Sequence, residues 1–183
     1  MSRRESPFTN FAFLVRDICQ LRRGPEDMPH SPALLGILIA ASVTLDCLVD
    51  AFLDRVSNVL GRSLVSAGLL LALCWIALYL RHLRNRYVQT ATALFACGIV
   101  FTLLILPLAW LGGLSGRGAI ELAPGLELLL GLAMLAVVIW NLAVNAHILR
   151  HALDAPFAFA FLLALIWAVA DLALGHALFD SAG

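Results

Sequence analysis

The sequence predicts an all-α, polytopic membrane protein with five transmembrane helices preceded by an amphipathic interfacial helix. The chain has 183 residues, of which 62% are hydrophobic and only 13% charged. Its mean hydropathy is +0.94, which is more apolar than a soluble core can absorb. Five apolar stretches approach or exceed the about 20 residues that one bilayer crossing needs, and one shorter stretch near the amino terminus has helical amphipathic spacing.

The first element is the amphipathic segment, within a cytoplasmic region that we assign to residues 1–32. Wound at about 100° per residue, the segment from Pro7 to Arg23 gathers its apolar side chains on one arc: Phe8, Phe11, Leu14, Val15, Ile18 and Cys19. Gly24 and Pro25 are expected to end this helix, and further prolines make a short stiff connector. Two roles stay open for the helix, docking of a cytoplasmic partner or simple contact with lipid headgroups.

The second region, residues 33–183, is predicted to hold all five spans. At about 1.5 Å per residue the apolar stretches fit a bilayer best over about 33–52, 63–80, 89–111, 125–148 and 156–179. The second of these has no charge between Arg62 and Arg81. The third lies inside a longer charge-free stretch, and Pro107 is expected to favour a kink near its outer end.

The arginines predict the orientation. All twelve cations are Arg, and they balance twelve Asp and Glu, so a basic surplus for nucleic acid is absent. With the amino terminus in the cytoplasm, nine arginines lie inside and only Arg55, Arg62 and Arg117 lie outside. Flanking cations resist translocation, so we expect a multi-pass protein of a bacterial inner membrane with its carboxyl terminus on the periplasmic or extracellular side.

Carboxylates inside the spans are the main candidate for function, because each is costly in a bilayer. Asp46 and Asp50 lie four residues apart on one face of the first span, and Asp171 lies in the fifth. Counting about 1.5 Å per residue puts Asp46 about 20 Å and Asp171 about 22 Å from the cytoplasmic edge. Small residues share these faces, so we predict that spans one and five pack together and enclose an acidic site.

Two interpretations of that acidic site remain open. In the first it is a proton or cation relay, or an intramembrane docking site, in which a proton or a nearby cation offsets the carboxylates. The candidate counter-ions are Arg55, Arg62, Arg117 and His176. In the second, Asp50 and Asp54 merely reach the outer headgroups, while Asp46 and Asp171 bond to backbone or to Thr44.

Other polar residues predict structure more than chemistry. Asn141 and Asn145 lie four apart on the fourth span and are expected to make helix–helix polar contacts. The histidines near the cytoplasmic face, His30, His82, His147 and His151, have no Cys or carboxylate at ligand spacing, so interfacial roles are favoured over metal or haem. Hydrolase and phosphate-binding motifs are absent from the sequence. We therefore predict no catalytic residue, metal or cofactor.

The chain resembles bacterial members of the Yip family. The resemblance rests on the arginine-bearing segment that ends in prolines, on five spans, and on a fourth span that runs through Trp140 into Ile148-Leu149-Arg150. It implies the five-span topology, and in eukaryotic relatives a role in membrane trafficking with small GTPases. The composition, rich in Ala, Leu and Arg without Lys, suggests a bacterium in which such partners are not expected, and no functional residue is carried over.

Two hypotheses for function follow. The first is a non-enzymatic scaffold, assembly factor or small subunit of a membrane complex, which uses the interfacial helix and the acidic face to contact a membrane-protein partner or a second copy. The alternative is a transport or proton/cation-coupling component that uses Asp46, Asp50 and Asp171.

Overall fold

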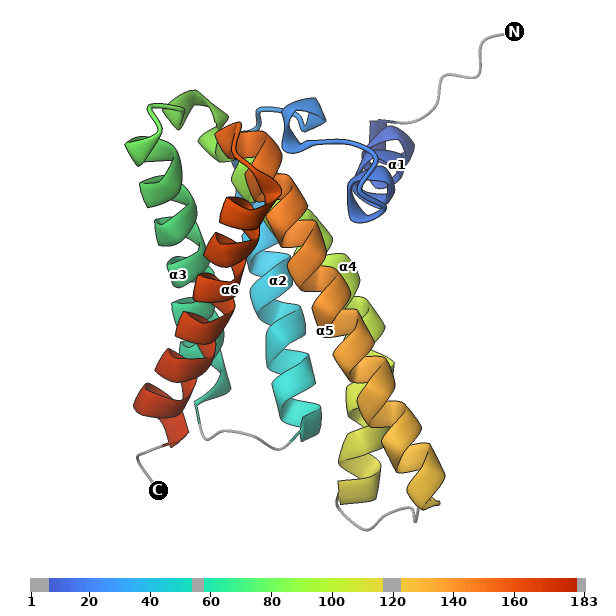
Figure 1. Ribbon diagram of the computed structural model, residues 1–183. Coiled ribbons are helices and arrows are strands. Elements are labelled where there is room, and N and C mark those ends of the chain that lie inside the picture. The colour runs from blue at the N-terminus through green and yellow to red at the C-terminus, as the bar shows by residue number, and fades with distance from the viewer. Residues whose placement is uncertain (1–6, 54–57, 117–122, 181–183) are drawn as a thin grey trace, which may run out of the picture.

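The computed structural model describes residues 7–53, 58–116 and 123–180, and these are helical apart from short turns (Figure 1). The α-helices are α1 Pro7–Cys19, α2 Pro32–Leu53, α3 Val59–Leu80, α4 Tyr87–Gly116, α5 Pro124–Leu153 and α6 Phe157–Gly175. Three further turns are helical, namely η1 Pro25–Asp27, η2 Arg84–Arg86 and the π-helical η3 His176–Asp180. The all-α prediction is confirmed.

Five of the described helices, α2 to α6, are long and apolar enough to cross a bilayer, which confirms the predicted number of spans. Two of them are longer than expected. α4 occupies the whole charge-free stretch of 30 residues with Pro107 inside it, and α5 continues past Arg150 to Leu153. The expected ends at 111 and 148 assumed one bilayer thickness, whereas both helices continue beyond that length.

The helices α2 to α6 run alternately up and down (Figure 1). The two ends of the bundle carry different elements. One end carries α1, the start of α2, the turn at η2 and the turn between α5 and α6. The opposite end carries the end of α2, the start of α3 and the end of α6. The amino-terminal segment and the last helix therefore finish on opposite ends of the bundle.

The packing order corrects one prediction. α2 packs chiefly on α4, and α6 packs chiefly on α5, while α2 and α6 are not packed along their lengths. The expected contact between spans one and five is therefore wrong. The small residues that were expected to form this contact have other surroundings. On α2, a Cβ at Gly36 would meet nothing within 4 Å, and on α6, Ala160 and Ala164 are buried in a core shared with α5.

The best-packed core lies toward the α1 end. Its largest buried side chains come from α1, η1 and the spans: Ile18, Met28, Leu78, Phe101, Val144, Ile148 and Leu153. Phe101 meets Trp140 edge to face, with ring centroids 5.5 Å apart. Inside a bilayer, such close packing of side chains is what holds helices together.

The predicted amphipathic helix is confirmed as α1, and its apolar arc has a definite contact. Val15, Ile18 and Cys19 are buried against α4 and α5, whereas Arg16 and Gln20 on the polar arc are exposed. The arc therefore belongs to the core of the chain itself.

Large apolar side chains are exposed along the outer faces of the bundle. On α5 and α6 they include Leu128, Leu129, Leu132, Leu135, Ile139, Leu162, Ile166, Val169 and Leu172. A protein in water rarely exposes so large a contiguous apolar surface, whereas lipid covers it without cost. The chain is a multi-pass integral membrane protein.

Candidate functional site

A polar cavity of about 270 Å³ lies among the spans, and all five of them line it. Its three carboxylates lie toward the end of the bundle away from α1, in the second halves of α2 and α6. The rest of the lining extends to the middle of α4 and to the half of α5 nearer to α1. Its polar lining consists of Ser42, Asp46, Asp50, Arg62, Ser63, Ser66, Thr102, Asn141, Asn145, Trp167 and Asp171.

The cavity brings together the three carboxylates that the sequence singled out. Asp46 and Asp50 reach it from successive turns of α2, and Asp171 reaches it from α6. The two helices do not need to touch for this to happen, since the cavity separates them. The grouping of the acidic residues was thus expected from depth and helical spacing, although the packing that was expected to enclose them is different.

Asp46 is held by two hydroxyl groups. Ser42, one turn earlier on α2, donates to Oδ2 over 3.4 Å, and Thr102 of α4 donates to Oδ1 over 3.4 Å. Thr44, the partner considered from the sequence, instead donates to the carbonyl oxygen of Ala40. Both bonds to Asp46 are long, and an ionised carboxylate has about four acceptor positions, so its capacity to accept further donors is not exhausted.

Arg62 supplies a positive charge at the cavity. It lies in the first turn of α3, which begins after the Asn58 cap, and it reaches across to α6. A Cβ built on Gly175 would lie 3.5 Å from both Nε and Nη2 of Arg62, so the guanidinium rests one helical turn beyond Asp171. Among the proposed counter-ions Arg62 lines the cavity and His176 does not, while Arg55, Arg117 and the neighbouring Asp54 fall outside the described residues.

Asn141 and Asn145 face the same cavity from α5. Asn145 Nδ2 donates to Asn141 Oδ1 over 3.0 Å, so the bond runs along one helix rather than across to a neighbour. Asn145 is buried, with 5% of its surface exposed. These two side chains are the described contribution of α5 to the lining, and they add amide donors and acceptors to it.

Sequence reasoning missed the hydroxyl and aromatic parts of the lining. The cavity is also lined by Ser63 and Ser66, three residues apart on α3, and by Gly98 and Thr102, four residues apart on α4. This helical spacing, which puts each pair on one face, was the sequence signal that could have identified them. Trp167 also lines the cavity, and its Nε1 is a fully buried nitrogen without a hydrogen-bond partner among the described residues.

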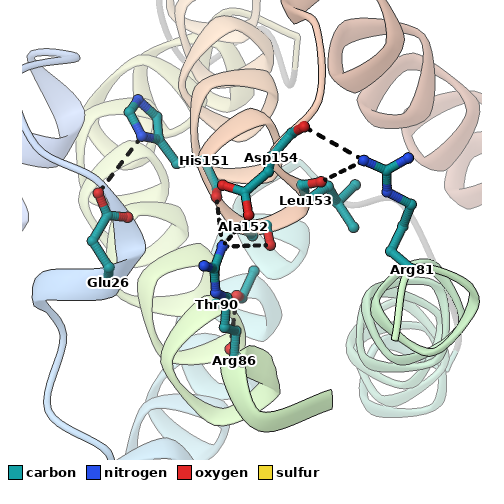
Figure 2. A network of polar contacts seen from close by, with 8 residues as sticks. All are labelled: Glu26, Arg81, Arg86, Thr90, His151, Ala152, Leu153 and Asp154. Carbon is teal, nitrogen blue, oxygen red and sulfur yellow. Dashed lines mark hydrogen bonds and ion pairs between the residues drawn. The ribbon is translucent and has the colours of Figure 1, made fainter. Parts of the chain in front are cut away.

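A second polar cluster closes the other end of the bundle (Figure 2). Arg86 Nη1 lies 2.9 Å from Asp154 Oδ2 and also donates to the carbonyl oxygens of His151 and Ala152. Arg81 Nη2 donates to the carbonyl oxygen of Leu153 over 3.1 Å. These are carbonyls that an α-helix leaves unsatisfied at its carboxyl end, so the two arginines cap α5 and favour its dipole.

The amino-terminal segment is tied to this end by side chains of α4 and α5. Trp140 Nε1 donates to the carbonyl oxygen of Cys19 over 3.0 Å, and His147 Nε2 lies 3.1 Å from that of Arg23. Gln89 Nε2 donates to the carbonyl oxygens of Glu26 and Met28 over 3.2 and 2.8 Å. We call these three side chains, Gln89, Trp140 and His147, the strap contacts.

Two of the histidines, His147 and His151, make contacts within the chain. The rings of His147 and His151 lie with their centroids 4.5 Å apart and are tilted by 58°, and His151 Nδ1 lies 3.6 Å from Glu26 Oε1. Within the described ranges, no three His, Cys, Asp or Glu side chains form a group that could hold a metal ion.

No family model, curated protein or solved structure matches this chain. The resemblance to the Yip family therefore stays a prediction. What the chain itself displays is a short amino-terminal helix followed by five long apolar helices.

Proposed function

We propose that this protein is a non-enzymatic transport or proton/cation-coupling component of a membrane. The observation that carries the proposal is the polar cavity to which all five spans contribute, with Asp46, Asp50 and Asp171 in its lining. Ionisable groups at membrane depth are expensive, and in membrane proteins they mark ion and proton pathways. A set of carboxylates gathered on one cavity is therefore best explained by a polar or charged species that enters it.

The cavity suits coupling because its carboxylates share one space with a cation. Arg62 offsets one negative charge, and a proton or a bound cation offsets a second. Movement of such a species in or out changes the local charge in a medium of low dielectric constant, where charges interact strongly. A bound species can therefore shift the balance between different arrangements of the helices that line the cavity.

Two observations disfavour the scaffold hypothesis, because the two surfaces that it would use for a partner are engaged within the chain. The apolar arc of α1 is buried on α4 and α5, and the acidic side chains line a cavity between helices rather than an outward face. Only the polar arc of α1 and the apolar faces toward lipid are left for a partner. The coupling hypothesis is therefore preferred over the scaffold.

We place the protein in the inner membrane of a bacterium, with its amino terminus in the cytoplasm and its carboxyl terminus outside. The support is the distribution of arginines, because Arg16, Arg22 and Arg23 share one end of the bundle with Arg81, Arg84, Arg86 and Arg150. With this orientation the three carboxylates of the cavity lie toward the outer side of the bilayer.

The test is flux through liposomes that contain the purified protein, with a pH-sensitive dye to report protons and, in parallel, a potential-sensitive dye to report net movement of any cation. Under an imposed membrane potential we expect proton or cation flux above that of empty liposomes. Asp46→Asn combined with Asp171→Asn should abolish it, whereas Asp27→Asn, an exposed carboxylate of the amino-terminal segment, should leave it unchanged. Equal flux in the double variant and the unmodified protein would overturn the proposal, as would flux no higher than in empty liposomes.

A further inference from the structure

We infer that the cavity binds a small organic ammonium ion, either a primary amine or a diamine, and this inference rests on the proposed transport or coupling function. Three carboxylates and one guanidinium belong to the described lining. Without counting Asp50, the carboxylates of Asp46 and Asp171 exceed the guanidinium of Arg62 by one negative charge when both are ionised. A monovalent organic cation offsets that charge.

The hydrogen-bonding character of the lining suits an ammonium group. An ammonium ion donates three hydrogen bonds and accepts none. Asp46 receives only two long bonds, from Ser42 and Thr102, and so it can accept a further donor. The side-chain oxygens of the two Asn residues and the remaining Ser residues add neutral acceptors around the same space.

The apolar part of the lining distinguishes an organic cation from a bare inorganic ion. Val49, Leu70, Leu94, Phe95 and Ile105 line the cavity beside the carboxylates. A small alkyl chain gains from contact with these side chains, whereas a hydrated metal ion does not. The volume of about 270 Å³ also exceeds the space of about 30 Å³ that one water occupies in the liquid.

The carboxylates of the lining disfavour a simple anion, and Arg62 sharpens the choice between a cation and a zwitterion. Its guanidinium lies against α6 near Gly175, one turn from Asp171. A zwitterion would need Arg62 as the partner of its own carboxylate, whereas an amine would be repelled by Arg62. Removing the guanidinium therefore has opposite effects on the two ligand classes.

Binding to the full-length protein in a neutral detergent is measured by titration calorimetry with three probes: butylamine, butane-1,4-diamine and the zwitterion 4-aminobutanoate. Ionic strength is held constant with sodium chloride, so that sodium serves as the inorganic competitor. Aliphatic amines stay protonated at neutral pH. We expect both amines to bind and the zwitterion to bind at least ten-fold more weakly.

Variants assign the binding to the cavity. Asp46→Asn with Asp171→Asn should weaken the amines at least ten-fold, while Asp27→Asn should not change their affinity. Arg62→Gln should leave amine binding equal or stronger. Because the double variant removes two charges from the bundle, its thermal unfolding without ligand is compared with that of the unmodified protein, and Asp46→Glu, which keeps the carboxylate, should retain binding.

The outcomes separate this inference from the function on which it rests. Tighter binding of 4-aminobutanoate, together with its loss in Arg62→Gln, would overturn the amine in favour of a zwitterion. Flux without amine binding would refute the inference and leave the coupling function standing. Amine binding without any flux would support the ligand class while the coupling function fails.

Discussion

Arg86 lies 2.9 Å from Asp154, and this contact joins the turn before α4 to the residue that ends α5. Asp154 has φ 48° and ψ 47°, the left-handed conformation that commonly follows the last residue of a helix. The same arginine nitrogen bonds the carbonyl oxygens of His151 and Ala152. One side chain thus fixes both the end of α5 and the turn into α6.

We expect Arg86→Ala to lower the free energy of unfolding by about 1–2 kcal/mol, because carbonyl oxygens at the end of α5 lose their donor. Asp154→Asn should cost no more than about 0.5 kcal/mol, since the pair is largely exposed and Asn tolerates the left-handed conformation. Unfolding by denaturant in detergent measures both. If Asp154→Asn were as destabilising as Arg86→Ala, the ion pair rather than the carbonyl bonds would be the important contact.

A second prediction concerns the strap contacts. Trp140→Phe keeps an aromatic ring beside Phe101 but removes the donor to the carbonyl oxygen of Cys19. The loss of about 1 kcal/mol corresponds to about five-fold more frequent release of the amino-terminal segment. Limited trypsin digestion after Arg22 and Arg23 should become faster by that factor. Trp75→Phe is the control, because Trp75 is exposed and stacks on Tyr79 far from the segment in sequence.

The spans were predictable because the sequence marks them directly. Apolar length sets their number, and arginines separate the second span from its neighbours. The ends of α4 and α5 were less predictable. α4 runs through Gly112 and Gly113, although glycine commonly follows the end of a helix, and α5 continues beyond 148 to Leu153. The cap on α5 comes from Arg81 and Arg86, which are distant in sequence, so no local pattern could have revealed it.

The site was predictable in part for a similar reason. Spacing placed Asp46 beside Asp50, and residue counting gave Asp171 a similar depth, so their meeting could be anticipated. Pairing of helices could not, because small residues allow close packing on any neighbour that presents a matching surface. Thr102 and Arg62 join the site only through the arrangement of α3 and α4 around the cavity.

Orientation gives a third prediction. A reporter enzyme that is active only outside the cytoplasm, fused after Gly183, should be active in a bacterial host, because five spans carry the chain to the opposite side from its arginine-rich segment. The same reporter fused before Met1 should be inactive. Activity of the amino-terminal fusion and inactivity of the carboxyl-terminal one would reverse the orientation and place the three carboxylates toward the cytoplasmic side.

The final prediction uses two glycines that differ in what they face. Gly98 on α4 lines the cavity, while Gly68 on α3 does not, and a Cβ at either position would meet nothing within 4 Å. Gly98→Leu should therefore enter the cavity without a backbone clash and reduce flux by at least ten-fold, with the thermal midpoint unchanged or raised because leucine favours a helix. Gly68→Leu should raise helix propensity equally and leave flux unchanged. Liposome flux and thermal unfolding of both variants are the measurements, and unchanged flux in Gly98→Leu would show that the transported species does not pass through this cavity.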